Sequence, residues 1–351
     1  MNRQFEKSIA NKFLATLGQK TMRITLMKSG MVHRSFLVET FDQDEYILQA
    51  VNTHVFHDLA HLATLQQEIA SHLSKVNYPQ AILKPVQFEG QIYLIDEQKG
   101  FVWRMFEGIK NSRNLERLFL ASQSFEAAKS LSDLHFYLKN VQKQTLNNNH
   151  VDFFRSKHVQ QTFIAIKETS NPLKTSQVNE LIAVIEDFRS ILMHDAIIHD
   201  DQSSCIHGDP KLNNFLYDLT GTSVNAIIDW DTFMFGSIYL DIAIMVSSFC
   251  IDQTEQASTA IFNEKMFHEI LNGYNSGKMG PLLERLDRDK LFAYTQKVLL
   301  TQAIRFLADY LNGDVSFQAY DLQLNIKRCQ DQLSLLKELL VFKQQYYHSK
   351  A

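Results

Sequence analysis

The sequence contains only three cysteines, Cys205, Cys250 and Cys329, and their number is odd and their spacing wide. This pattern excludes a disulfide framework and matches no zinc site, so we expect reduced, buried thiols. No apolar run approaches the roughly 20 residues that span a membrane. Residues 1–18 have the pattern of a short amphipathic helix and lack the apolar core of a signal peptide. These absences predict a cytoplasmic protein with no membrane segment.

An excess of positive charge is also absent. The chain has 35 Lys and Arg against 39 Asp and Glu, a formal net charge of -4, and the basic residues are spread out. Proteins that bind nucleic acid through phosphate contacts need basic residues clustered on one surface, so no nucleic-acid partner is expected. With 351 residues, 45% of them hydrophobic, the chain can form a sizeable core and two lobes.

The most informative stretch runs from residue 205 to 243 and reads CIHGDPKLNNFLYDLTGTSVNAIIDWDTFMFGSIYLDIA. Two short apolar runs flank a turn that contains Gly221, which predicts a β-hairpin. Antiparallel pairing of these runs brings Asn214 and Asp229 to one end of the hairpin. Asp209 precedes the first strand and can reach the same end.

An amide and carboxylates gathered in this way suit Mg²⁺, which prefers oxygen ligands and keeps several waters or phosphate oxygens. Asn214 and Asp229 can hold the metal ion, which leaves Asp209 to orient or deprotonate a hydroxyl. These are the parts that phosphoryl transfer requires. A hydrolase built on His207 and Asp209 is the alternative, but neither a nucleophile elbow nor an ordered triad is present.

His207-Gly-Asp209 with Asn214 five residues later, followed by Ile-Ile-Asp229-Trp-Asp231, resembles the catalytic and metal loops of the aminoglycoside phosphotransferase and choline kinase superfamily. The resemblance implies the bilobal, α+β protein-kinase-like fold. It implies a strand-rich nucleotide-binding lobe over residues 1–105 and a mainly helical lobe with a catalytic hairpin over residues 106–351. Asp209 would be the catalytic base, Asn214 and Asp229 the magnesium ligands, and ATP the co-substrate.

Four residues around this site have open roles. His207 is either catalytic or a hydrogen-bonded brace of the loop, and the brace is favoured. Asp231 is either a second metal ligand or a solvated carboxylate. Asp241 is expected to anchor the loop, or to cap the apolar helix that starts near Ile242, rather than to meet substrate. Arg305 is either a surface or helix-pairing cation or a guanidinium that stabilises the transferred phosphoryl group.

Period-two alternation within residues 21–40 predicts two strands around Ser29 and Gly30. A glycine between strands lets backbone amides approach an anion closely, so this turn is a candidate nucleotide-phosphate loop.

The next predicted strand, residues 45–51, carries Gln49 where most of the superfamily has a phosphate-binding lysine. Gln49 cannot supply that charge, so the nucleotide clamp must differ, and Arg34 is the candidate replacement. The pattern at residues 58–76 predicts an amphipathic helix. Glu68 lies within it where the fold usually has an acidic partner of that lysine, and with the lysine absent a solvated face is at least as well favoured.

Residues 85–97 and 100–105 are predicted to form two further strands, ending at a hinge over residues 106–108. By resemblance, backbone groups of Met105, Phe106 and Glu107 would meet the adenine. Helical spacing predicts helices at 125–138, 177–197, 262–274, 282–312 and 323–342.

Pieces outside the loop resemble the bacterial N-acetylhexosamine 1-kinases in particular. They are Tyr46-Ile47-Leu48-Gln49 with Val51-Asn52, Asp229-Trp230-Asp231-Thr232 with Gly236, and Arg305-Phe306-Leu307 with Asp309-Tyr310-Leu311-Asn312-Gly313-Asp314. This resemblance implies a sugar acceptor whose anomeric hydroxyl is phosphorylated to a sugar 1-phosphate. The chain departs from that branch at Asp241-Ile242-Ala243 and at Ser316, so an altered substrate is a live alternative.

The sequence therefore predicts an ATP- and Mg²⁺-dependent kinase of a small hydroxylated metabolite. Two alternatives stay open. The acceptor could be an amino alcohol such as choline or an aminoglycoside. Alternatively, the chain could be a non-catalytic nucleotide-binding protein, which Gln49 favours. Intact Asp209, Asn214 and Asp229 together argue against that alternative. A protein kinase is disfavoured because no Ala-Pro-Glu segment is present. The oligomeric state and the choice between ATP and GTP stay open.

Overall fold

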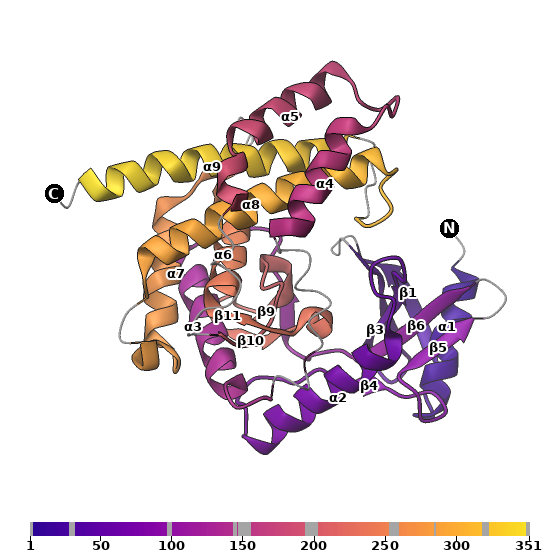
Figure 1. Ribbon diagram of the computed structural model, residues 1–351. Helices are drawn as coiled ribbons and strands as arrows, with labels where there is room; N and C mark the ends of the chain where they lie inside the picture. Colours follow the sequence, from indigo (N-terminus) through magenta and orange to yellow (C-terminus); the bar gives the residue numbers. More distant parts are fainter. Residues whose placement is uncertain are drawn as a thin grey trace.

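The computed structural model describes residues 3–27, 32–96, 100–142, 146, 156–193, 203–252, 260–283, 286–317 and 323–348. Ser29 and Gly30, the candidate phosphate loop, lie outside these ranges. The molecule is bilobal, with the N-terminal sheet at the lower right of Figure 1 and a mainly helical lobe above and to the left of it. The predicted α+β, bilobal architecture is confirmed.

The N-terminal lobe is an antiparallel sheet in the order β1-β2-β3-β6-β4, with β5 also paired to β6. Helix α1 packs on one face, where its apolar side chains form a compact cluster with those of β2, β3 and β6. The elements are α1 (Gln4–Ala15), β1 (Thr21–Leu26), β2 (Arg34–Thr40), β3 (Glu45–Val51), β4 (Pro85–Val86), β5 (Tyr93–Asp96) and β6 (Phe101–Glu107).

The single strand predicted over residues 85–97 is wrong. A tight turn interrupts the strand between β4 and β5, with a bridge between Phe88 and Gln91 and positive φ angles of 50° at Glu89 and 76° at Gly90. Both short strands pair with β6. Alternation alone could not detect this turn, because one non-glycine residue in it adopts the left-handed conformation.

Helix α2 (Leu59–Lys75) begins where Asp58 caps it, the Asp58 carboxylate accepting a 2.9 Å hydrogen bond from His61 N. Its inner face does not join the cluster around α1. Leu65, Ile69 and Leu73 instead belong to the larger hydrophobic cluster of the C-terminal lobe. Glu68 is exposed, as expected for a solvated face.

The C-terminal lobe contains the predicted catalytic hairpin, β9 (Phe215–Asp218) and β10 (Val224–Ile227), extended by β7 (Ser112–Asn114). A second pair joins β8 (Ser203–Ile206) to β11 (Met234–Ser237), and a third joins β12 (Ile251–Asp252) to β13 (Ile261–Phe262). The helices are α3 (Ala121–Leu138), α4 (Ser156–Glu168), α5 (Ser176–Asp187), α6 (Ile238–Phe249), α7 (Glu264–Ser276), α8 (Arg288–Leu311) and α9 (Leu324–His348).

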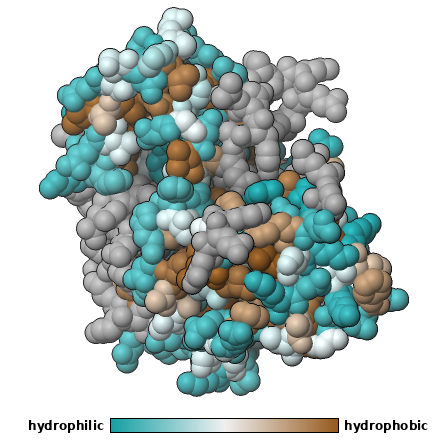
Figure 2. Space-filling view, turned by 90° about the vertical axis from the view of Figure 1, so that its right-hand side faces the viewer, coloured by the Kyte–Doolittle hydropathy of each residue, from teal (hydrophilic) through white to brown (hydrophobic). Residues whose placement is uncertain are grey.

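Helix α6 is the centre of this lobe, because nearly all of its side chains are buried. The three cysteines are buried and unbridged, as expected. Within the described ranges, no helix combines the length and the apolar character that crossing a membrane requires. Figure 2 shows a face on which hydrophobic residues gather across the lower middle, with further ones at the upper left, among mostly hydrophilic neighbours.

Candidate active site

The loop at the start of the site is held by a buried carboxylate. Asp241, which is fully buried on α6, accepts hydrogen bonds from His207 N at 2.7 Å and Gly208 N at 2.8 Å. His135 contacts the same carboxylate at 2.9 Å and Tyr274 Oη at 2.7 Å. Asp241 therefore anchors the loop, and the predicted capping role is wrong, because Ser237 caps α6.

His207 braces the loop from inside. Its ring is fully buried, Nδ1 accepts a 3.2 Å hydrogen bond from Asp209 N, and Nε2 lies 3.0 Å from Ile228 O. Because Nδ1 accepts, Nε2 must carry the hydrogen and donate to Ile228 O. His207 therefore joins Asp209 to the end of β10, and both of its nitrogens are used by the protein.

Asp209 lies between an amide and a cation. The Asn214 side-chain nitrogen donates to Asp209 O at 2.7 Å and contacts Oδ2 at 3.3 Å, and Lys211 Nζ pairs with Oδ2. Burial lowers the pKa of Lys211, but the charges of Asp209 and Asp229 outweigh burial and raise it. Lys211 therefore keeps its charge beside the predicted base.

Asp229 follows β10 in the left-handed conformation, with φ 69° and ψ 66°. Its carboxylate has no hydrogen bond to any residue in the described part of the chain and lines a cavity together with Asn214. A carboxylate and an amide oxygen form a donor set that fits Mg²⁺. Asn214 can offer its oxygen because its nitrogen is bound to Asp209.

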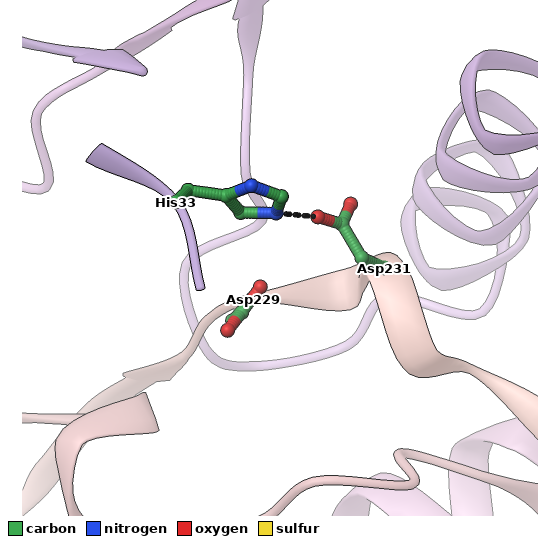
Figure 3. A group of neighbouring side chains, drawn as sticks. All are labelled: His33, Asp229 and Asp231. Atoms are coloured by element: carbon green, nitrogen blue, oxygen red, sulfur yellow. Dashed lines mark hydrogen bonds and ion pairs between the residues drawn. The ribbon is translucent and has the colours of Figure 1, made fainter. Parts of the chain in front are cut away.

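Burial decides one of the two roles considered for Asp231, while its role as a second metal ligand stays a prediction. Asp231 is 1% exposed, so it is not a solvated carboxylate. Arg104 reaches it with two hydrogen bonds of 2.6 Å, while Gln66 Nε2 lies 2.6 Å from Oδ1 and His33 Nε2 lies 2.7 Å from Oδ2. Figure 3 shows His33 against Asp231 and the Asp229 carboxylate apart from both. The side chains of His33, Asp229 and Asp231 place possible ligand atoms within 4.8 Å of one another, but both oxygens of Asp231 are already engaged.

A first cavity of about 290 Å³ lies between the sheet and the hairpin. Apolar side chains from both lobes line it, and Asn214, Asp229 and Lys211 lie at its polar end. Phe106 and Glu107 line it where the sheet joins the C-terminal lobe, whereas Met105 is fully buried behind it.

Gln49, which stands where most of the superfamily has a phosphate-binding lysine, and Arg34, its candidate replacement, lie in different places. Gln49 lines the first cavity, accepts a 2.9 Å hydrogen bond from Arg104 Nε and donates one of 3.0 Å to Ser35 Oγ. Arg34 is half exposed, pairs with Glu6 of α1 at 3.5 Å and does not line this cavity. The structure therefore directs Arg34 away from the first cavity.

A second cavity, also of about 290 Å³, opens on the other side of the catalytic loop. Asp209, Lys211 and Arg305 line it, and Lys211 lines both cavities. Burial lowers the pKa of Arg305, while the charges of Asp209 and Asp309 oppose that shift. Arg305 is therefore partly buried and lines the same cavity as the predicted base, while the choice among its predicted roles stays open. Ser316 and Asp241 do not line this cavity.

Sequence reasoning missed four residues of the site: His33, Gln66, Arg104 and Lys211. Lys211 could have been found, because it stands two residues after Asp209 within the motif. The other three carry no local signal. They meet Asp231 only through contacts between residues that are 198, 165 and 127 positions apart in the chain.

A strand-rich lobe beside a helical lobe, with the candidate loop and hairpin lining cavities between them, is consistent with the arrangement of kinase-like phosphotransferases. Residues 23–268 match the model of the family described as APH, the phosphotransferase enzyme family, and the chain belongs to it. It is accordingly a small-molecule phosphotransferase.

Solved structures with the same fold cover most of the chain. A spectinomycin phosphotransferase in complex with ADP and spectinomycin is 12% identical, with TM-score 0.57, over 95% of this chain and 98% of that one. An amicoumacin kinase with AMP-PNP and Ca²⁺ is 14% identical, with TM-score 0.59, over 95% and 93%. An aminoglycoside phosphotransferase from Alicyclobacillus acidocaldarius is 12% identical, with TM-score 0.57, over 93% of each chain. At these identities the likeness is one of fold.

Proposed function

We propose that this enzyme transfers the γ-phosphoryl group of ATP, with Mg²⁺, to a hydroxyl of a small uncharged or anionic metabolite. The first candidate is an N-acetylhexosamine phosphorylated at its anomeric hydroxyl. One observation carries the proposal: Asp209 lines the second cavity, Asn214 and Asp229 line the first, and Lys211 lines both. A nucleotide in the first cavity would direct its terminal phosphate toward the acceptor in the second.

Each residue has a role that follows from its position. Asp209 would accept the proton of the attacking hydroxyl, while Asn214 and Asp229 would hold Mg²⁺, which bridges and neutralises the phosphates. Lys211 and Arg305 would stabilise charge on the oxygens of the transferred group. His207 would keep Asp209 in place and take no part in proton transfer.

The charges of the second cavity favour an acceptor that is not a cation. Lys211, Arg305 and Arg328 line it against two carboxylates, Asp209 and Asp331. Asp331 already accepts a hydrogen bond from Lys327 at 3.1 Å. A polycationic aminoglycoside would therefore meet a cavity with more positive than negative charge.

The aromatic residues of this cavity do not form a cage for a choline-type cation. Phe306 and Phe317 line it, but Arg305 lies 5.3 Å from the Phe317 ring centre and Arg328 lies 5.6 Å from that of Phe306. A ring face that already contacts a guanidinium binds a second cation less favourably.

Polar groups of the second cavity suit a sugar. Gln332 lines it, and its buried Oε1 has no hydrogen-bond partner among the residues described. A buried acceptor without a partner costs free energy, so a hydroxyl donor from a ligand would be favoured there. Ser247, Ser248 and Gln302 add hydroxyl and amide groups to the same wall.

The test is Mg²⁺-dependent release of ADP with N-acetylglucosamine, N-acetylgalactosamine, choline and an aminoglycoside as acceptors. We expect turnover on an amino sugar, its loss on chelation of the metal, and a fall of about 10²- to 10⁴-fold in Asp209→Asn. Asp289→Asn, an exposed carboxylate at the start of α8, is the matched control and should keep full activity.

Each other result has a distinct meaning. Turnover only on choline or an aminoglycoside would reject the uncharged or anionic acceptor and keep the role of Asp209. Binding of ATP without turnover on any acceptor, in a wild-type protein indistinguishable from Asp209→Asn, would favour the non-catalytic alternative.

A further inference from the structure

The most unusual feature of the first cavity is a buried cation on the sheet. Arg104 lies on β6, lines this cavity and is 1% exposed. Its guanidinium makes the bidentate pair with Asp231, whose two oxygens also contact Gln66 and His33. A bidentate pair fixes the orientation of both partners as well as their distance.

The contacts of Asp231 come from separate elements of the N-terminal part of the chain. Arg104 lies on β6, Gln66 on α2, and His33 immediately before β2. His33 is itself oriented, because its Nδ1 accepts a 3.1 Å hydrogen bond from Asn52 N. Asp231 thus ties the turn after β10 to three elements of the other lobe.

The second link runs across the sheet. Arg104 and Gln49 are directly paired in the register of β3 and β6, so their side chains point to the same face. Gln49 Oε1 accepts a hydrogen bond from Arg104 Nε. Gln49 therefore orients the guanidinium of Arg104. The positive charge on this face of the sheet comes from Arg104 on β6, and not from a lysine at position 49 on β3.

We propose that Arg104 is a positioning residue for the metal-binding turn: by clamping Asp231 from β6, it holds the two lobes together and keeps Asp229 facing the nucleotide. This inference rests on the proposed function, because it assumes that Asp229 binds the metal of Mg·ATP. In this role Asp231 orients Asp229 two residues away and is not itself a ligand.

The electrostatics agree with this geometry. Burial opposes the charged form of Asp231, but Arg104 and His33 outweigh it and hold the pKa of Asp231 well below its usual range. Asp231 is therefore an anion at neutral pH, although it is cut off from water.

The test measures binding of the ATP analogue AMP-PNP with Mg²⁺ by calorimetry. The variant Arg104→Gln/Asp231→Asn removes both charges together, so that no buried charge is left without a partner. We expect its affinity for Mg·AMP-PNP to fall by about 10- to 100-fold, as when groups that orient a metal ligand are lost. In turnover assays the KM for ATP should rise and the KM for the acceptor should not change.

Three further variants distinguish a positioning role of Arg104 from a general effect on stability. Gln49→Arg/Arg104→Gln exchanges the paired side chains across the two strands and should recover part of the affinity. Arg23→Gln/Glu39→Gln removes an exposed ion pair of the same sheet and should bind as the wild type does. Arg104→Lys keeps the charge without the bidentate fork and should show an intermediate loss.

Unchanged affinity for Mg·AMP-PNP in Arg104→Gln/Asp231→Asn would overturn the inference and leave the proposed function standing. If that variant does not fold, wild-type affinity in Arg104→Lys would overturn it instead. Failure of the wild type to bind Mg·AMP-PNP would overturn the proposed function, and the inference with it.

Discussion

At the scale of single residues, Lys211 connects the two halves of the site. Its ammonium group pairs with Asp209 and lines both cavities. A cation in this place would stabilise the negative charge that develops on the oxygens of the phosphoryl group during transfer.

We expect Lys211→Gln to lower kcat by roughly 100-fold, as when one donor that stabilises transition-state charge is removed. Lys211→Arg, which keeps the charge, should lose less. Steady-state kinetics with both variants tests this expectation. Equal kcat values for wild type and Lys211→Gln would show that the cation does not act on the reaction.

The raised pKa of Lys211 sets the pH at which this effect is present. A lysine whose pKa is raised by folding stays charged below its ordinary value of about 10.4 and loses the proton only as the pH rises through the higher folded value. The ratio of wild-type to Lys211→Gln kcat should therefore stay constant from about pH 7 to pH 9. A ratio that falls toward 1 across this range would contradict the persistent charge.

At the scale of elements, the turn of the catalytic hairpin is closed by one carboxylate. Asp218 accepts hydrogen bonds from Thr220 Oγ1 at 2.8 Å, Gly221 N at 2.6 Å, Thr222 N at 3.0 Å and Ser223 Oγ at 2.9 Å. These contacts, led by that of Thr220, hold the pKa of Asp218 below its usual range. The turn fixes the register that brings the two ends of the hairpin together.

We expect Asp218→Ala to lower the Tm at neutral pH, because the turn loses its common acceptor. A carboxylate whose pKa is lowered by folding stabilises the fold above its ordinary pKa of about 3.9 and loses this effect as the pH falls through the lower folded value. Thermal melts should therefore show a difference between wild type and variant that shrinks below about pH 4. A difference that grows in acid would contradict this role.

Close packing of α3 against α7 leaves no room for a side chain at Gly273, which leads to a second prediction for these elements. A Cβ at Gly273 would lie 2.1 Å from Phe125 O, a backbone atom that cannot rotate away. Replacing a helical glycine by alanine ordinarily stabilises by about 1 kcal/mol. Forcing atoms into a packed interior costs about 1–3 kcal/mol, and here the obstacle is backbone, so the cost is at the upper end and outweighs the gain.

Gly273→Ala should therefore lower the free energy of unfolding measured by urea titration. Asn272→Ala is the matched control, because Asn272 is exposed on the same helix, and its effect should stay within about 0.5 kcal/mol. A Gly273→Ala protein more stable than wild type would mean that the two helices separate easily.

Features that depend on neighbouring residues could be predicted from the sequence, whereas contacts between distant elements could not. The hairpin around Gly221 was predictable because turn residues interrupt two apolar runs, and α2 because apolar residues recur every three or four positions. Asp209, Asn214 and Asp229 share one short stretch, so their meeting follows from local pairing. The contact of Arg104 with Asp231 does not, because it depends on the register of β3 with β6 and on how the lobes meet.

At the scale of the whole molecule, the hydrophobic clusters divide the chain differently from the lobes. The boundary predicted between residues 105 and 106 stays a prediction. The smaller cluster joins α1 to β2, β3 and β6, while the larger one contains the C-terminal lobe together with the inner face of α2. Helix α2 therefore lies by sequence in the first lobe and packs its apolar face with the second.

This division predicts which parts of the molecule unfold together. In mild denaturant, the amide hydrogens of α2 and α3 should exchange with solvent as one unit, separately from those of α1, because cooperative units follow shared buried contacts.

Leu73→Ala and Leu14→Ala form a matched pair, since both leucines are fully buried, one in each cluster. Each substitution should lower the free energy of unfolding by about 2–5 kcal/mol. Mass spectrometry should show that Leu73→Ala speeds exchange in α3 and Leu14→Ala in α1. If Leu73→Ala instead affected α1 and left α3 unchanged, α2 would belong to the sheet.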